Sequence, residues 1–109
     1  MKKTVSVLAL FALAACGSAK LVAPTQAHVD RASEIYPGYT LAQMNEGKGL
    51  YEQKCDKCHG LKDPTAFSPD RFMEVTPKMV EMANERQQVI SSEEAELIEK
   101  YLVTAAMGA

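Results

Sequence analysis

The sequence predicts a small all-α domain that follows an export signal and a flexible tether. Three segments, starting near residues 40, 68 and 91, open with helix-capping residues and then repeat apolar side chains at helical spacing. No segment alternates apolar and polar side chains in the manner of a half-buried strand. We therefore expect about three main helices within a domain of residues 35–109, preceded by a tether over residues 16–34.

The first helix is expected from Thr40 to Lys54. Thr40 can cap this helix, and Gln43, three residues later, completes a capping-box pattern. Gly47 and Gly49 each weaken a helix interior by about 0.8–1 kcal/mol relative to alanine. Because glycine has no side chain, it allows another helix to cross closely, so we expect a helix crossing at these positions.

The second helix is expected to begin at residues 68–70, Ser-Pro-Asp. Serine as the cap, proline at the first helical position and an acidic residue in the first turn each favour a helix start. Pro77 interrupts this helix and disfavours helical geometry at Thr76. We expect a kink or a break at Thr76 and then a second short turn that presents Met79. The apolar face of the segment comprises Phe72, Val75, Met79, Met82 and Ala83.

The third helix is expected from Ser91 to about Ala106, because Ser91 and Glu94 form a second capping box. It should bury Ala95, Ile98 and Leu102, with parts of Leu97 and Tyr101. An apolar core alone is marginal in a domain of this size, so a bound group would supply much of the interior.

Residues 1–15 are expected to form a signal peptide. Lys2 and Lys3 precede an uncharged apolar run over residues 5–12, and this run is too short to span a bilayer as a mature helix. The sequence Leu13-Ala14-Ala15-Cys16 then resembles the lipobox of bacterial lipoproteins, in which the cysteine is acylated and becomes the first mature residue. This resemblance implies a lipid anchor at Cys16, on the periplasmic side of the inner or outer membrane of a bacterium. The alternative is an ordinary signal peptide with an incidental cysteine.

The charge balance argues against nucleic acid as a partner. Removal of residues 1–15 lowers the 12 Lys and Arg residues to 10, against 14 Asp and Glu, for a net charge of −4. Neutralising phosphates requires clustered basic side chains, which this balance does not favour.

Residues 55–59, Cys-Asp-Lys-Cys-His, form the motif that indicates a cofactor. The thiols of Cys55 and Cys58 can add to the two vinyl groups on one edge of a haem, and His59 then supplies the proximal nitrogen to the iron. A disulfide, half of a zinc site and a thioredoxin-like redox pair are the alternatives. Zinc needs four ligands, and His28 is the only other histidine that could complete such a site. A thioredoxin-like pair needs a βαβ pattern, which the sequence lacks. The motif thus predicts one covalent haem c per chain, and acylation would account for the third cysteine.

The residues around this motif resemble those of small class I-like cytochromes c. That family often has a glycine, an aromatic residue four positions on, and the first haem cysteine four positions later, as Gly47, Tyr51 and Cys55 are spaced here. Its last helix crosses the first near that glycine and often carries an aromatic residue, a role that Tyr101 fits. The resemblance covers residues 35–104 and implies a compact class I-like cytochrome c fold with electron transfer, rather than enzymatic catalysis, as its function.

The resemblance also implies a distal iron ligand. In a compact monohaem subfamily, an aromatic residue is followed seven positions later by the ligand methionine, and Phe72 and Met79 have this spacing. Met79 is therefore the expected ligand, with Met82 as the runner-up and Met73 and His28 as further alternatives. With both axial positions filled, no open site remains for oxygen or a substrate, which favours electron transfer.

Several other side chains are expected near the haem. Arg71 would pair with a propionate, and four lysines around the motif would form a docking rim, although a solvated surface is the alternative for each. The expected docking rim comprises Lys48, Lys54, Lys57 and Lys62. The expected haem walls are Tyr39, Tyr51, Leu61, Phe67, Phe72 and Val75.

Three functions fit these features. The first is a membrane-tethered one-electron carrier between a periplasmic dehydrogenase or respiratory complex and an acceptor. The second is a haem c subunit that stays bound to one periplasmic oxidoreductase. The third is a haem-based sensor or peroxidase, which requires a vacant or displaceable distal position.

Overall fold

The structure, a computed structural model, describes residues 21–55, 63–86 and 89–109. The helices within these ranges are α2 (Gln26–Ala32), α3 (Leu41–Lys54), the 3-10 helix η2 (Pro64–Ala66), α4 (Pro69–Glu85) and α5 (Ser92–Met107). No strand occurs among these residues, so the all-helical class is confirmed for the described chain. None of the described helices is both long and apolar enough to cross a membrane.

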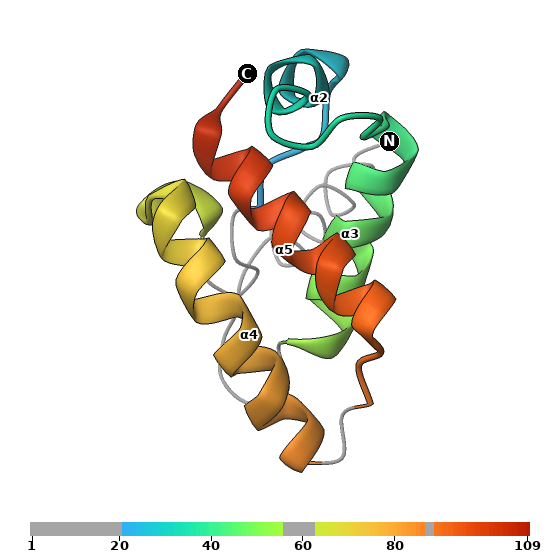
Figure 1. Ribbon diagram of the computed structural model, residues 1–109, viewed down its shortest axis with the longest axis vertical. Coiled ribbons are helices and arrows are strands. Elements are labelled where there is room, and N and C mark those ends of the chain that lie inside the picture. The colour runs from blue at the N-terminus through green and yellow to red at the C-terminus, as the bar shows by residue number, and fades with distance from the viewer. Residues whose placement is uncertain (1–20, 56–62, 87–88) are drawn as a thin grey trace, which may run out of the picture.

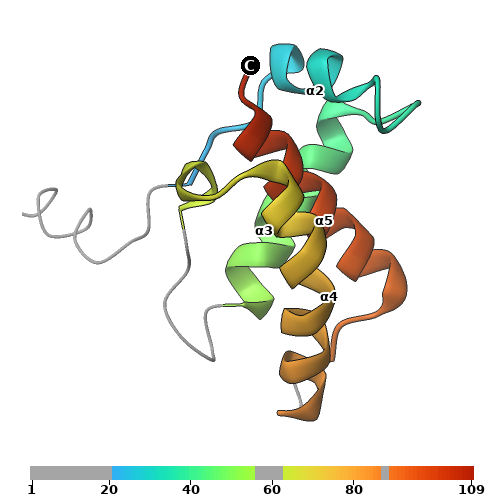
Figure 2. The ribbon, with the colours of Figure 1, turned by 60° about the vertical axis from the view of Figure 1, so that its left-hand side comes forward.

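Helix α5 is the centre of the compact arrangement. Helices α3 and α4 pack against it on separate flanks, and α2 lies over its C-terminal half (Figures 1 and 2). The helix η2 also packs on α5, whereas α3 and α4 do not pack closely on each other. Because it has neighbours on several sides, α5 buries more of its surface than one apolar face. Its buried residues are Ile98, Tyr101, Leu102, Val103, Thr104 and Ala105.

The starts of α3 and α5 are as the capping residues predict. The Gln43 backbone N–H donates to Thr40 Oγ1 at 3.1 Å, and the Thr40 backbone N–H donates to Gln43 Oε1 at 3.0 Å. Ser91 and Glu94 make the same reciprocal pair, at 3.0 and 3.1 Å. Each box satisfies two backbone donors that a helix start would otherwise leave without partners.

The expected helix crossing is present at Gly47 and absent at Gly49. A Cβ atom at Gly47 would overlap the Leu97 carbonyl oxygen on α5. A Cβ atom at Gly49 would meet nothing within 4 Å, so the close-crossing explanation is wrong for that glycine.

Helix α4 is continuous through Pro77, so of the kink or break expected at Thr76 the break is wrong. The start is as predicted: the Arg71 N–H donates to Ser68 Oγ at 3.1 Å, and Pro69 is the first helical residue. Proline removes one hydrogen bond from the helix interior. Burial of Phe72, Thr76 and Ala83 on the α4 face that packs on α5 offsets that loss.

The expectation that residues 17–34 lack helical structure is wrong for α2. Thr25 caps this helix, and His28, Val29 and Ala32 are buried where it packs on α5. Preceding α2, Val22 accepts a hydrogen bond of 2.8 Å from the Tyr101 hydroxyl. The chain is therefore bound to the helical body from residue 21 onward. The predicted signal peptide and Cys16 lie outside the described residues.

Candidate functional site

Cys55 lies directly at the C-terminal end of α3. Its backbone N–H donates to the Tyr51 carbonyl at 3.1 Å, which caps the helix, and its half-buried side chain packs against the apolar core. The backbone position of the first predicted thioether is thus held by the helix end. Cys58 and His59, with the rest of residues 56–62, lie outside the described residues.

Helix α4 contributes the second part of the candidate site. Phe72 is buried, and Val75 and Met79 are half-buried and pack against the same core as Cys55. The other two methionines of α4 point outward, with Met82 49% and Met73 38% exposed. Of the three, Met79 alone packs against this core.

Helices α3 and α4, which lead to Cys55 and Met79, share α5 as their packing partner. Both pack on α5 without packing closely on each other, and the C-terminal end of α3 lies level with the middle of α4 (Figures 1 and 2). Cys55, Val75 and Met79 each retain partly exposed apolar surface. The thiol of Cys55 and the thioether of Met79 thus both pack against the core and keep part of their surface exposed.

A cleft of about 450 Å³ between α4 and α5 is separate from this site. Val80 and Asn84 line it from α4, and Ala95 and Glu99 line it from α5. Neither Cys55 nor Met79 is among its lining residues. Burial and the neighbouring Glu96 carboxylate raise the pKa of Glu99, in that order of importance.

The aromatic residues form separate ring pairs. Tyr51 lies one turn before Cys55, and its ring centroid is 6.3 Å from that of Tyr101. Phe67 packs edge-on against Phe72 at 5.6 Å and is 41% exposed. Tyr51 is accordingly the one of these rings within a turn of Cys55, and the Phe67 ring is partly exposed next to η2.

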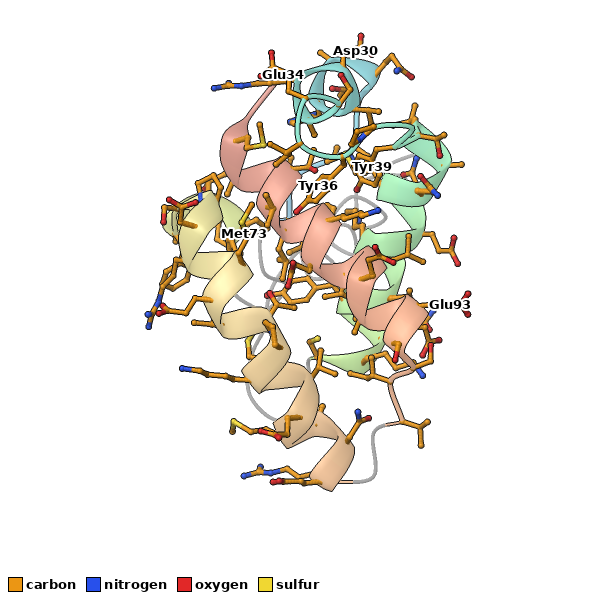
Figure 3. The ribbon with its side chains drawn as sticks, viewed as in Figure 1. Asp30, Glu34, Tyr36, Tyr39, Met73 and Glu93 are labelled. Atoms are coloured by element: carbon orange, nitrogen blue, oxygen red, sulfur yellow. The ribbon has the colours of Figure 1, made fainter. Side chains whose placement is uncertain are left out.

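Tyr39 does not lie near Cys55. It precedes α3, whose 14 residues separate the two positions by about 21 Å at a rise of ~1.5 Å per residue. Tyr39 packs instead against Tyr36, with ring centroids 5.8 Å apart (Figure 3). The Lys100 ammonium lies 5.3 Å from the Tyr36 ring and 5.9 Å from the Tyr39 ring. Tyr39 therefore lies at the opposite end of α3 from Cys55, and Leu61 lies outside the described residues.

The charged residues near the motif have partners within the chain. Lys54 Nζ donates to the Val89 carbonyl at 2.8 Å and lies 3.8 Å from Glu94. Lys48 pairs with Glu52 at 3.5 Å, and Arg71 pairs with Glu74 at 2.8 Å on the surface. The described lysines of the expected docking rim are thus neutralised locally; Lys57 and Lys62 lie outside the described residues.

His28 is buried rather than solvated. Its Nδ1 atom lies 2.6 Å from the hydroxyl oxygen of Thr25, and this oxygen also accepts the His28 backbone N–H at 3.3 Å. These contacts place His28 in the first turn of α2. Thr25, directly after Pro24, is a helix-capping residue and is the feature of the sequence that indicates α2 within the expected tether.

No protein-family model, curated protein or solved structure matches this chain. Within residues 21–55, 63–86 and 89–109, no three His, Cys, Asp or Glu side chains are grouped as a metal site would need. The Cys-x-x-Cys-His motif, whose first cysteine ends α3, is therefore the main indication of function.

Proposed function

We propose that this chain is a one-electron transfer protein with one covalent c-type haem. Cys55 and Cys58 would hold the haem by thioether bonds, His59 would be the proximal iron ligand, and Met79 the distal one. One observation carries the proposal. The motif begins at the helix cap of α3, where Cys55 packs against the same core as Met79.

The fold proposed for this function is the class I-like cytochrome c fold. Support comes from the backbone crossing of α3 and α5 at Gly47 and from the Tyr51–Tyr101 ring pair beside it. These are the glycine and the two aromatic positions that the resemblance names. The crossing orders α3, and the end of α3 in turn orders Cys55.

The haem, when bound, would supply exchange of one electron between ferric and ferrous iron. The protein's own residues would tune that exchange. A methionine thioether is a weaker donor than a second imidazole, so Met79 would favour the ferrous state and raise the reduction potential. The apolar side chains of Phe72 and Val75 would exclude water around that ligand.

The proposed location is the periplasmic side of a bacterial membrane, with Cys16 acylated. The proposed partners are other redox proteins, such as a dehydrogenase or a respiratory complex. The charge of −4 on the mature chain would steer it weakly toward a basic docking patch.

Covalent attachment is the decisive test. Mass spectrometry of the mature protein after denaturation should show the polypeptide with one haem, and acidified butanone should extract none. Cys55→Ala or Cys58→Ala should leave the haem held by a single thioether bond or not attached at all. Cys16→Ser should leave haem attachment unchanged. Haem that extracts freely from the wild-type protein would refute the proposed function.

A further inference from the structure

The chain that precedes α2 is fastened to the helical body. The Tyr101 hydroxyl donates to the Val22 carbonyl at 2.8 Å, and Leu21 and Val22 are partly buried against the core. Tyr101 itself is fully buried in α5. Residues 21 and 22 therefore belong to the folded body, although they precede the first described helix.

This attachment lies beside η2. Burial raises the pKa of Tyr101, the Glu52 carboxylate raises it further, and Tyr51 and Asp63 have smaller effects in the same direction. Asp63 caps η2, and η2 packs on α5. The segment from residue 21 and η2 lie side by side in both ribbon views (Figures 1 and 2).

The distance from the predicted lipid to this point is short. Five residue steps separate Cys16 from Leu21, and a chain extends by at most about 3.6 Å per residue, so they span no more than about 18 Å. A tether running to residue 34 would have allowed several times that reach. The acylated protein therefore cannot move its η2 side far from the bilayer.

We propose that the surface formed by Leu21, η2 and Phe67 rests on the lipid bilayer. This inference depends on the proposed acylation of Cys16. Phe67 follows η2 directly and is 41% exposed, and Thr65 and Ala66 of η2 are exposed as well. An aromatic ring of this kind is suited to the headgroup region of a bilayer.

The charge near this surface indicates which forces would hold it on the bilayer. Asp63 caps η2, and its acidic group does not favour attraction to anionic headgroups. The covalent lipid and the apolar side chains would supply the attachment in its place. Membrane contact should consequently persist at high ionic strength, unlike that of a polybasic surface.

The test uses acylated holoprotein isolated from cells and reconstituted in vesicles of phosphatidylethanolamine and phosphatidylglycerol. With Cys16 acylated and the other two cysteines in thioethers, Ala66→Cys adds a single thiol for a nitroxide label. Val89→Cys is the matched control, because Val89 is 75% exposed and lies beyond the far end of α4. Each label is compared with the same label on the soluble Cys16→Ser protein.

The label at position 66 should become several-fold less accessible to a water-soluble nickel chelate on the vesicles, at low and high salt alike. The label at position 89 should not change. If mass spectrometry shows acylation at Cys16 and the two labels remain equally accessible, the membrane-facing surface is refuted while the haem function stands. If the mature protein carries no lipid, the inference is refuted together with the anchor, and haem attachment is still tested separately.

Discussion

Gly47 of α3 lies directly against the carbonyl group of Leu97 of α5. A Cβ atom at Gly47 would overlap the Leu97 oxygen and lie 3.0 Å from both the Leu97 carbonyl carbon and Tyr101 Cβ. The two helices therefore cross backbone to backbone, which brings Tyr51 and Tyr101 together one turn from Cys55.

Gly47→Ala should destabilise the protein although alanine is the better helix former. Alanine gains about 0.8–1 kcal/mol of helix propensity, but forcing a methyl group into this crossing costs about 1–3 kcal/mol or more, since backbone must move. Gly49→Ala is the matched control and should stabilise, because its methyl group meets open space. Urea unfolding followed by circular dichroism would measure the free energy of unfolding of both variants. Equal values for Gly47→Ala and Gly49→Ala would contradict the close helix crossing at Gly47.

Met79→Ala should abolish the weak sulfur-to-iron absorption band of the oxidised protein, an expectation carried over from the cytochrome c resemblance. It should also lower the reduction potential, since the thioether no longer favours ferrous iron. Met73→Ala and Met82→Ala should keep both properties, because these side chains are exposed. Loss of the band in Met82→Ala and its survival in Met79→Ala would assign the ligand to Met82.

Stability should fall in strongly alkaline solution because Tyr39 is buried and Tyr36 half-buried. Burial raises the pKa of each phenol from 10.0 to about 12. The Glu99 carboxylate adds to the rise at Tyr36, whereas the Thr104 hydroxyl lowers the pKa of Tyr39 by less than burial raises it. In the unfolded chain these phenols ionise near pH 10, so their contribution is complete below that pH and disappears as the pH rises through about 12.

Urea unfolding at a series of alkaline pH values would measure this loss. Tyr39→Phe should flatten the decline between pH 10 and 12, because phenylalanine does not ionise. An unchanged slope in Tyr39→Phe would show that other groups cause the alkaline unfolding.

Cys16→Ser should convert a detergent-partitioning protein into one released from membranes, because serine accepts no thioether-linked lipid. Phase partitioning and the mass of the mature N-terminus are the measurements. A mature protein that begins at any residue other than Cys16 would contradict the lipobox interpretation.

Helix starts were predictable from the sequence because a cap is a local interaction. Thr40 with Gln43 and Ser91 with Glu94 each bond across three residues, and both pairs form as the sequence indicates. The same local reasoning failed at Pro77, where packing of α4 on α5 outweighs one missing hydrogen bond. It also failed at α2, because seven residues form a stable helix only through packing against a neighbour.

The candidate site divides in the same way. The Cys-x-x-Cys-His motif can be recognised from the sequence alone, because the two thioether cysteines and the proximal histidine lie within five consecutive residues. The chain has six methionines, in contrast, and composition alone does not identify which of them is the distal ligand. The resemblance favours Met79 by its spacing from Phe72, and the packing of α4 on α5 separates half-buried Met79 from exposed Met82. Tertiary structure also decided where the tether ends, since the Tyr101–Val22 bond joins residues 79 positions apart.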